Sequence, residues 1–226
     1  MALKRDGTVW TWGTNIYGQL GNGKIEGSIS PKQVKKLQGV KQIVASAFHT
    51  VALQEDGNVW AWGRNNYGQL GNGTTKNSNH PVRVKNLEGV KQITAGALHT
   101  VALKEDGSVW AWGNNSVDQL CRSDIKYSDE AVQIDKLIGV TQVSAGDEYT
   151  MALKEDGSAW IWGGEYNVAQ PVGVKKIIGL EQLIFGTERL EKCNQIVAGS
   201  DFGLAIKEDG TIWQWKYDKK IVKVFK

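Results

Sequence analysis

The sequence is poor in several features that mark particular classes of protein. It has two cysteines and three prolines in 226 residues. Cys121 and Cys193 lie at different points of the repeat described below, and a disulfide or metal site would need more partners than these. The net charge of +3 is too small to indicate a nucleic-acid partner. No apolar run approaches the roughly 18 residues of a membrane span, and no signal peptide follows Met1, so we expect no nucleic-acid and no membrane partner.

Motifs of catalysis are also missing. The chain has no nucleophile–base motif, no Walker loop, no HExxH and no paired cysteine cluster. His49 and His99 share one repeat position, at which Tyr149 and Phe202 stand later. Because a catalytic or metal role would not tolerate that exchange, we expect packed histidines with one hydrogen bond each. The sequence therefore predicts a protein that is not an enzyme, with no cofactor and no metal.

Tryptophan and glycine, in contrast, are abundant, with 10 and 27 residues. All tryptophans fall in five Trp-x-Trp pairs within one recurring pattern, which reads ALKEDGSVWAWG from Ala102. The pattern returns at offsets of 50, 50, 50 and 53 residues. A period near 50 residues with strand-like content indicates a repeat architecture.

Each repeat contains four short strand-like segments. In the repeat from Gly89, GVKQITAG and HTVALKEDG are two strands, Asp-Gly makes a tight turn, and SVWAWG and a later short segment complete the set. The sequence thus predicts an all-β fold, a β-propeller of four-stranded antiparallel blades with about four and a half to five repeats of about 50 residues. We expect a single domain over 1–226, with repeats at about 1–38, 39–88, 89–138, 139–189 and 190–226.

The tryptophans are predicted to fill the space between blades. Trp110 and Trp112 share one face of a strand, and the small Val109 and Ala111 share the other. A large face can therefore pack against the small face of the next blade. We expect the following residues to form this core: Trp10, Trp12, Trp60, Trp62, Trp110, Trp112, Trp160, Trp162, Trp213 and Trp215.

The pattern GxxHTVALxEDGxVWxWGxNxxGQLGxG, which 47–73 fits almost throughout, resembles the repeat of the regulator of chromosome condensation family. The resemblance covers essentially the whole chain and implies a propeller, which in this family usually closes with seven blades. With fewer repeats, this chain is a fragment, an open arc, or a protein that associates with another copy through an unpaired blade edge. The fourth strand of the fourth repeat is either 171–178 or 181–186.

Function is expected on the rim whose loops differ between repeats. Connections in an antiparallel blade alternate between two rims, and the Asp-Gly turns on one rim hardly vary. The loops after the first and third strands share the other rim, and loops of this kind carry recognition. The predicted partner-binding residues are Phe48, Leu98, Asp147, Glu148, Tyr149, Asp201, Phe202, Arg64 and Glu165.

The sequence favours a non-enzymatic protein-interaction module that binds another protein through this rim. Exchange of guanine nucleotide on a small GTPase, an activity that the family resemblance implies, is one alternative, although the chain has no long insertion that could act as a wedge. Inhibition of a bacterial enzyme such as β-lactamase, known for a relative that binds through rim aromatics, is another. Ultraviolet sensing is disfavoured because the Gly-Trp-Arg-His-Thr pattern of the plant photoreceptor is replaced by AFHT and ALHT.

Overall fold

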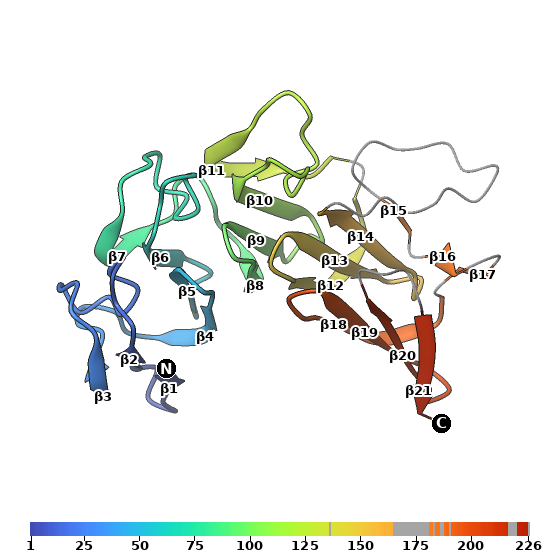
Figure 1. Cartoon of the computed structure of the whole chain (residues 1–226), viewed down its shortest axis with the longest axis horizontal. Coiled ribbons are helices and arrows are strands. Elements are labelled where there is room, and N and C mark those ends of the chain that lie inside the picture. Colours follow the sequence, from blue (N-terminus) through green and yellow to red (C-terminus); the bar gives the residue numbers. More distant parts are fainter. Residues whose placement is uncertain are drawn as a thin grey trace.

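The computed structural model describes the backbone of 1–135, 137–164, 181–182, 184–185, 188–189, 191–216 and 221–225, and the side chains of 1–135, 137–164, 191–214 and Val224. Within these residues the chain forms β-strands and turns and no helix. The strands group into consecutive antiparallel sheets, and Figure 1 shows these sheets following one another around an arc. The predicted all-β propeller of four-stranded blades is confirmed.

Blade 1 has three strands, and each of blades 2 to 5 has four. Blade 1 consists of β1 (Ala2–Leu3), β2 (Val9–Gly13) and β3 (Ser28–Gln33). Blade 2 consists of β4 (Val40–Ala45), β5 (His49–Gln54), β6 (Val59–Gly63) and β7 (Ser78–Arg83). Blade 3 consists of β8 (Val90–Ala95), β9 (His99–Lys104), β10 (Val109–Asn114) and β11 (Tyr127–Gln133). Blade 4 consists of β12 (Val140–Ala145), β13 (Tyr149–Lys154), β14 (Ala159–Gly163) and β15 (Glu181–Gln182). Blade 5 consists of β18 (Cys193–Ala198), β19 (Phe202–Lys207), β20 (Ile212–Lys216) and β21 (Ile221–Phe225), and a separate ladder joins β16 (Ile184–Phe185) and β17 (Glu188–Arg189).

The strands of a blade pair in chain order, so each blade is a simple meander. In blade 4, β15 pairs with β14 through Trp160 with Gln182 and Ile161 with Glu181. Of the two segments predicted for the fourth strand of this blade, 181–186 contributes Glu181–Gln182, whereas Ile184–Phe185 pairs in the separate ladder. The other segment, 171–178, lies outside the described residues. The first strands β4, β8, β12 and β18 contact one another in sequence and line the inside of the arc in Figure 1.

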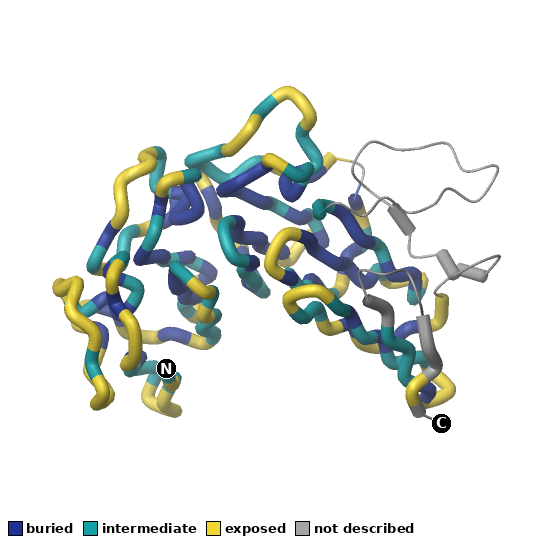
Figure 2. Tube along the Cα trace, in the orientation of Figure 1, coloured by how far each residue is buried: buried dark blue, intermediate teal, exposed yellow. Residues whose placement is uncertain are grey.

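The hydrophobic core lies between the blades. Four clusters of buried side chains each combine residues of two neighbouring blades. In the cluster between blades 2 and 3, Val51, Leu53 and Leu70 of blade 2 meet Ala102 and Trp112 of blade 3. Figure 2 shows buried positions along the strands and exposed positions mainly on the connecting loops. Each blade therefore depends on its neighbours for burial.

The second tryptophan of each pair anchors its blade to the preceding one. Trp62, Trp112 and Trp162 are buried, and the indole Nε1 of each donates a hydrogen bond of 2.9 Å to the carbonyl oxygen of Gln19, Gln69 or Gln119, respectively. These three residues confirm the predicted inter-blade core. Trp12 differs, because 41% of its surface is exposed; its assignment to the core is wrong.

The first tryptophan of each pair is only half-buried. Trp10, Trp110, Trp160 and Trp213 each donate Nε1 to the hydroxyl of the serine or threonine two residues earlier. Each lies beneath the ammonium of a lysine, at 4.5 to 5.4 Å from the ring centroid. Trp60 donates to Gln54 instead. These residues fasten the Asp-Gly turn, and Trp60, Trp110, Trp160 and Trp213 also pack against the inter-blade clusters, which bears out their assignment to the core. The side chain of Trp215 lies outside the described residues.

A series of glutamines on the first strands joins the blades by paired hydrogen bonds. Gln42 donates to the carbonyl of Ile93 and accepts from its amide, at 2.9 Å each. Gln92 makes the same two bonds to Val143, and Gln142 makes them to Ile196. Each glutamine side-chain amide thus donates to and accepts from the backbone of one residue in the next sheet, as a neighbouring strand would.

Candidate functional site

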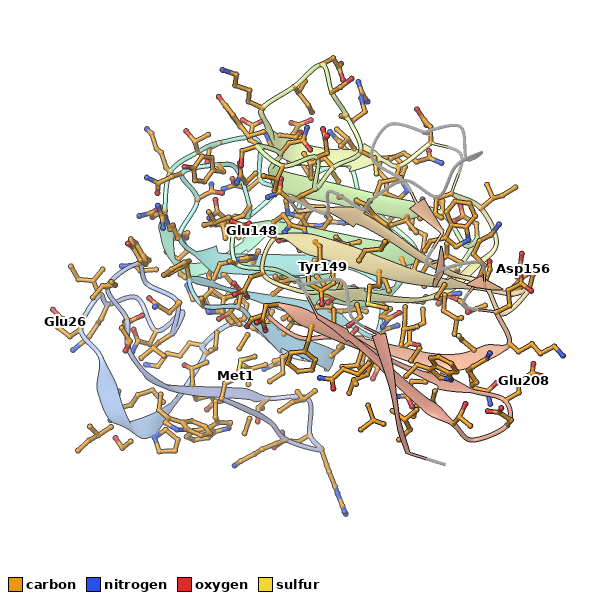
Figure 3. The ribbon with its side chains drawn as sticks, turned by 45° about the vertical axis from the view of Figure 1, so that its right-hand side comes forward. Met1, Glu26, Glu148, Tyr149, Asp156 and Glu208 are labelled. Carbon is orange, nitrogen blue, oxygen red and sulfur yellow. The ribbon has the colours of Figure 1, made fainter. Side chains whose placement is uncertain are left out.

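The two rims of the arc are built differently. On one rim, Asp106 accepts hydrogen bonds from the hydroxyl and backbone amide of Ser108, at 2.6 and 2.9 Å. These bonds hold the pKa of the Asp106 carboxyl below its ordinary value, because they favour the charged form. Asp106 thus has the predicted turn role. Figure 3 places Glu148 on one side of the molecule and the hairpin residues Asp156 and Glu208 on the opposite side. The variable loops therefore form a rim of their own.

On the variable rim, three segments meet between blades 1 and 2, between blades 2 and 3, and between blades 3 and 4, and we call each meeting point a rim junction. The backbone amide of Arg64, which follows β6, donates to the carbonyl of Phe48 in the loop before β5, at 2.9 Å. Asn114 and Leu98 make the equivalent bond one blade later. The third segment is the loop after the third strand of the preceding blade. At Gly63, a Cβ would lie 3.2 Å from Gln19 of that loop.

The first rim junction contains an aromatic pair that holds an arginine. The rings of Tyr17 and Phe48 meet edge to face, with centroids 5.7 Å apart and an interplanar angle of 88°. The guanidinium carbon of Arg64 lies 5.1 Å from the Tyr17 centroid and 5.2 Å from the Phe48 centroid. These distances are typical of cation–π contacts. Phe48 and Arg64 are both predicted rim residues, and the structure brings them together.

The other two junctions carry different side chains. At the second, Asn114 exchanges hydrogen bonds with Ser116 of its own loop. At the third, Glu148 is exposed beside the equally exposed Asp147. The first, second and third junctions contain Tyr17, Phe48 and Arg64; Tyr67, Leu98 and Asn114; and Val117, Glu148 and Gly164.

One predicted rim residue lies inside the molecule, and a second is half-buried at the same repeat position. Tyr149 is 0% exposed, so its assignment as a surface anchor is wrong; in Figure 3 it lies on the sheet beside Glu148. Its hydroxyl donates to the carbonyl of Phe202 in the next blade. Phe202 occupies the same repeat position, and its half-buried ring packs over Gly199. Both residues start a strand and turn inward, which the loop alignment alone did not reveal.

The histidines at this inward position are packed as predicted. His49 Nε2 lies 2.9 Å from the hydroxyl of Thr100, and His99 Nε2 lies 2.9 Å from that of Thr150. The Nδ1 atoms of both are buried and have no hydrogen-bond partner among the described residues. Burial lowers the pKa of His49 to about 3 and that of His99 to about 4. Both rings are therefore neutral links between blades.

The remaining predicted rim residues divide by exposure. Phe48, Leu98 and Arg64 are half-buried, whereas Asp147, Glu148 and Asp201 are exposed. Glu165 lies outside the described residues. Sequence reasoning missed Tyr17, although it lies in a GQLG loop of the kind that meets the other two segments. No group of three metal-ligating side chains occurs within the described ranges, nor do they contain a helix long and apolar enough to cross a membrane.

Comparison with known proteins relates the chain to repeat propellers. The model of the regulator of chromosome condensation (RCC1) repeat matches 6–53, 56–103 and 106–153, and a second model of that repeat matches 40–69, 90–119 and 140–167. A human probable E3 ubiquitin-protein ligase, HERC3, is 42% identical over 55 residues, which are 23% of this chain and 5% of that protein.

Two solved structures share the fold. Human WBSCR16 superposes with a TM-score of 0.77 at 22% identity, over 92% of this chain and 56% of that one. Saccharomyces cerevisiae Prp20p, described with its binding properties to Gsp1p and histones, superposes with a TM-score of 0.72 at 22% identity, over 93% of this chain and 54% of that one. The chain thus spans about half the length of these structures and a small part of the curated relative. Because the repeat model covers more than half of its residues, the chain belongs to the RCC1 repeat family.

Proposed function

We propose that this protein is a non-enzymatic interaction module that binds another protein through the variable rim. The observation that carries the proposal is the contrast between the rims. The Asp-Gly rim repeats one hydrogen-bonded turn, whereas the junctions of the variable rim present different side chains on one backbone. Side chains that vary on a fixed frame are suited to recognition, and an aromatic pair with an arginine is typical of interface hot spots.

Site-specific photo-crosslinking tests this proposal. A photoreactive amino acid at Leu98 on the variable rim should give one recurrent covalent adduct with a partner protein in extracts of the source cells. The same amino acid at Glu105, in the hairpin turn of the same blade, is the matched control and should give none. Adducts from Glu105 alone, or from neither position, would contradict binding through the variable rim.

Exchange of guanine nucleotide on a small GTPase remains the alternative for the activity. The description of Prp20p names Gsp1p, but a likeness at 22% identity shows the fold alone. Accelerated nucleotide release from a small GTPase would replace the binding-only proposal. Inhibition of a bacterial β-lactamase is the other alternative, and a steady-state inhibition assay would identify it.

We also propose that the protein associates with a second copy through its open blade faces. Trp12 stands at the repeat position of Trp62 but is 41% exposed. At the other end of the described arc, Gln195 and Val197 are exposed at positions that in blades 2 to 4 face a neighbouring blade. Each open face thus carries residues that elsewhere in the chain contact a blade.

A further inference from the structure

The first rim junction holds a positive charge whose donors have no partner in the protein. Among the described residues, Arg64 makes no ion pair, and its guanidinium donates no hydrogen bond. Of the three guanidinium nitrogens, only Nε is buried without a hydrogen-bond partner. The N–H donors of the two Nη groups therefore remain open to solvent. An arginine side chain is charged at every physiological pH. The junction therefore presents an uncompensated cation at the surface.

The aromatic rings fix this cation in place before any partner arrives. Tyr17 belongs to blade 1 and Phe48 to blade 2, and both lie about 5 Å from the Arg64 guanidinium carbon. The Arg64 backbone is fixed as well, by its hydrogen bond to Phe48. Ordering a free arginine costs side-chain entropy on binding, and a preorganised one avoids most of that cost. Both rings lie to one side of the guanidinium carbon, because their centroids are 5.7 Å apart and each is about 5 Å from that carbon. The other side is left for a planar acceptor.

The sister junctions show that the frame does not require this arrangement. At the second junction Leu98 replaces the phenylalanine, and the amide of Asn114 is satisfied by Ser116. At the third, Glu148 and Gly164 stand at the two positions. The backbone bond that defines a junction is the same for Arg64 and Asn114. The cation and the phenylalanine ring thus belong to one junction only, whereas the tyrosine recurs as Tyr67 at the second.

We infer that the first rim junction is the anchor point for an acidic side chain of a partner protein. Its carboxylate would accept hydrogen bonds from the Arg64 Nη groups while its methylene stem contacts Tyr17 and Phe48. Carboxylate–guanidinium pairs are the strong, geometrically selective class of charge-assisted hydrogen bond. The inference rests on the proposed function and adds the chemistry of the partner.

The distribution of charge on the rim orients such a partner. Asp147, Glu148 and Asp201, in the loops of blades 4 and 5, are exposed carboxylates on the same rim. They repel an acidic segment and attract a basic one. A partner segment whose acidic residue binds at blades 1 and 2 is therefore expected to carry its basic residues toward blades 4 and 5.

Peptide binding to the whole chain tests the inference. The probe is a fluorescein-labelled glutamate-rich peptide, followed by fluorescence anisotropy and by the NMR amide signals of Phe48 and Arg64. Both signals should shift, and the glutamine counterpart of the peptide should bind at least about tenfold more weakly. Absence of any shift with the glutamate peptide, or equal binding of both peptides, would overturn the inference.

The sister junctions supply matched variants that the fold already accommodates. Arg64→Asn, Phe48→Leu and Tyr17→Val each introduce the residue that another junction carries at that position. Arg64→Asn should weaken the glutamate peptide about tenfold or more, with smaller losses for the two ring variants, whereas Asn114→Ala at the second junction should leave its affinity unchanged. Unchanged affinity in a folded Arg64→Asn protein would refute the anchor.

Two further outcomes are separable. A phosphoserine peptide or an oligonucleotide that binds at this junction more tightly than the glutamate peptide would replace the acidic side chain by a phosphate group. If the Leu98 crosslink to a partner persists in Arg64→Asn, the rim proposal stands and the anchor fails. If the Leu98 crosslink is absent from the protein that retains Arg64, the proposed function fails whatever the peptide does.

Discussion

Single glycines decide where the rim side chains lie. Gly63 ends β6 with a φ of 111°, in the region that side chains rarely adopt. A Cβ there would approach the carbonyl oxygen of Phe48 to 2.6 Å, closer than non-bonded atoms allow. The glycine therefore lets the loop before β5 close onto the strand end, and this contact sets Arg64 beside Phe48.

Gly63→Ala is expected to unfold the first junction locally, and Gly13→Ala is its control. Gly13 has the same repeat position and a φ of 110°, but a Cβ there meets nothing within 4 Å. Both variants bear the same backbone strain, so the difference between them reports the clash with Phe48. We expect Gly63→Ala to lower the free energy of unfolding by about 1–3 kcal/mol more than Gly13→Ala, as measured by thermal denaturation. Equal losses would contradict the proposed contact.

The buried histidines make stability depend on pH. Their pKa values in the folded protein are about 3 and about 4, below the ordinary 6.5. Below pH 6.5 the unfolded chain binds protons at His49 and His99 that the folded chain does not, so stability falls with pH down to about pH 4, and further for His49. We expect a loss of roughly 1 kcal/mol per pH unit for each histidine.

The variant His99→Tyr, which copies Tyr149, should reduce this slope. Gly96 and Gly146 both lie directly beneath the ring at this position, so the larger ring has a precedent in the chain. His80→Gln, on an exposed side chain, should leave the slope unchanged. Denaturant titrations between pH 4 and pH 7 measure it, and an unaltered slope in His99→Tyr would count against a neutral buried imidazole.

Particular strands of each blade carry the contacts to its neighbours. The first strand supplies one glutamine that makes two hydrogen bonds to the following blade, and the third strand supplies a tryptophan that bonds to the preceding blade. Gln92 and Trp112 thus connect blade 3 to opposite neighbours. Because hydrogen bonds and burial act at the same contact, we expect neighbouring blades to unfold together.

Gln92→Leu is expected to destabilise the protein by about 1–3 kcal/mol, because it leaves both the amide and the carbonyl of Val143 without their partner. Gln195 stands at the same repeat position and is exposed. At concentrations where the protein is a single chain, its change to leucine should therefore fall within about 0.5 kcal/mol of the unmodified protein. Calorimetric melting of the two variants decides this. A loss in Gln195→Leu as large as in Gln92→Leu would indicate that Gln195 also faces a blade.

The sequence predicted the strands of a blade more completely than the contacts at the rim junctions. The period and the Trp-x-Trp pairs predicted the strand order, because the strands of one blade are formed by residues close together in the chain. The rim assignment failed at Tyr149 because a loop alignment does not reveal which residue first turns inward. Tyr17 was missed because its partners are 31 and 47 residues away, and contacts between blades leave no local pattern. Trp12 shares the local sequence of Trp62, and only the neighbouring blade makes their burial differ.

As a whole, the described residues form an arc with one blade face open at each end (Figure 1). Exposed Trp12 and Val197, 41% and 45% accessible, mark these faces. Between blades 2 and 3 and between blades 3 and 4, one blade face fits the next through the same tryptophan and glutamine contacts. Each open face thus exposes residues of the kind that join blades elsewhere in the described chain.

Association with a second copy should show as a particle of twice the 24.9 kDa chain mass in sedimentation equilibrium. Val197→Lys should shift the equilibrium toward the single chain, because it would place a charge in the contact. Lys192→Ala, at the exposed position before β18, is the control and should not. A particle of single-chain mass at all concentrations would show that the open faces do not bind each other.

The shared backbone of the rim junctions separates stability from recognition. A strand-ending glycine closes each junction, and a backbone bond ties the first two, so the frame does not depend on one particular set of three side chains. Substitutions at these positions can then accumulate without loss of the fold. The three junctions behave as duplicated copies that have diverged under separate demands, and a new specificity requires changes at only a few surface positions of a single blade pair.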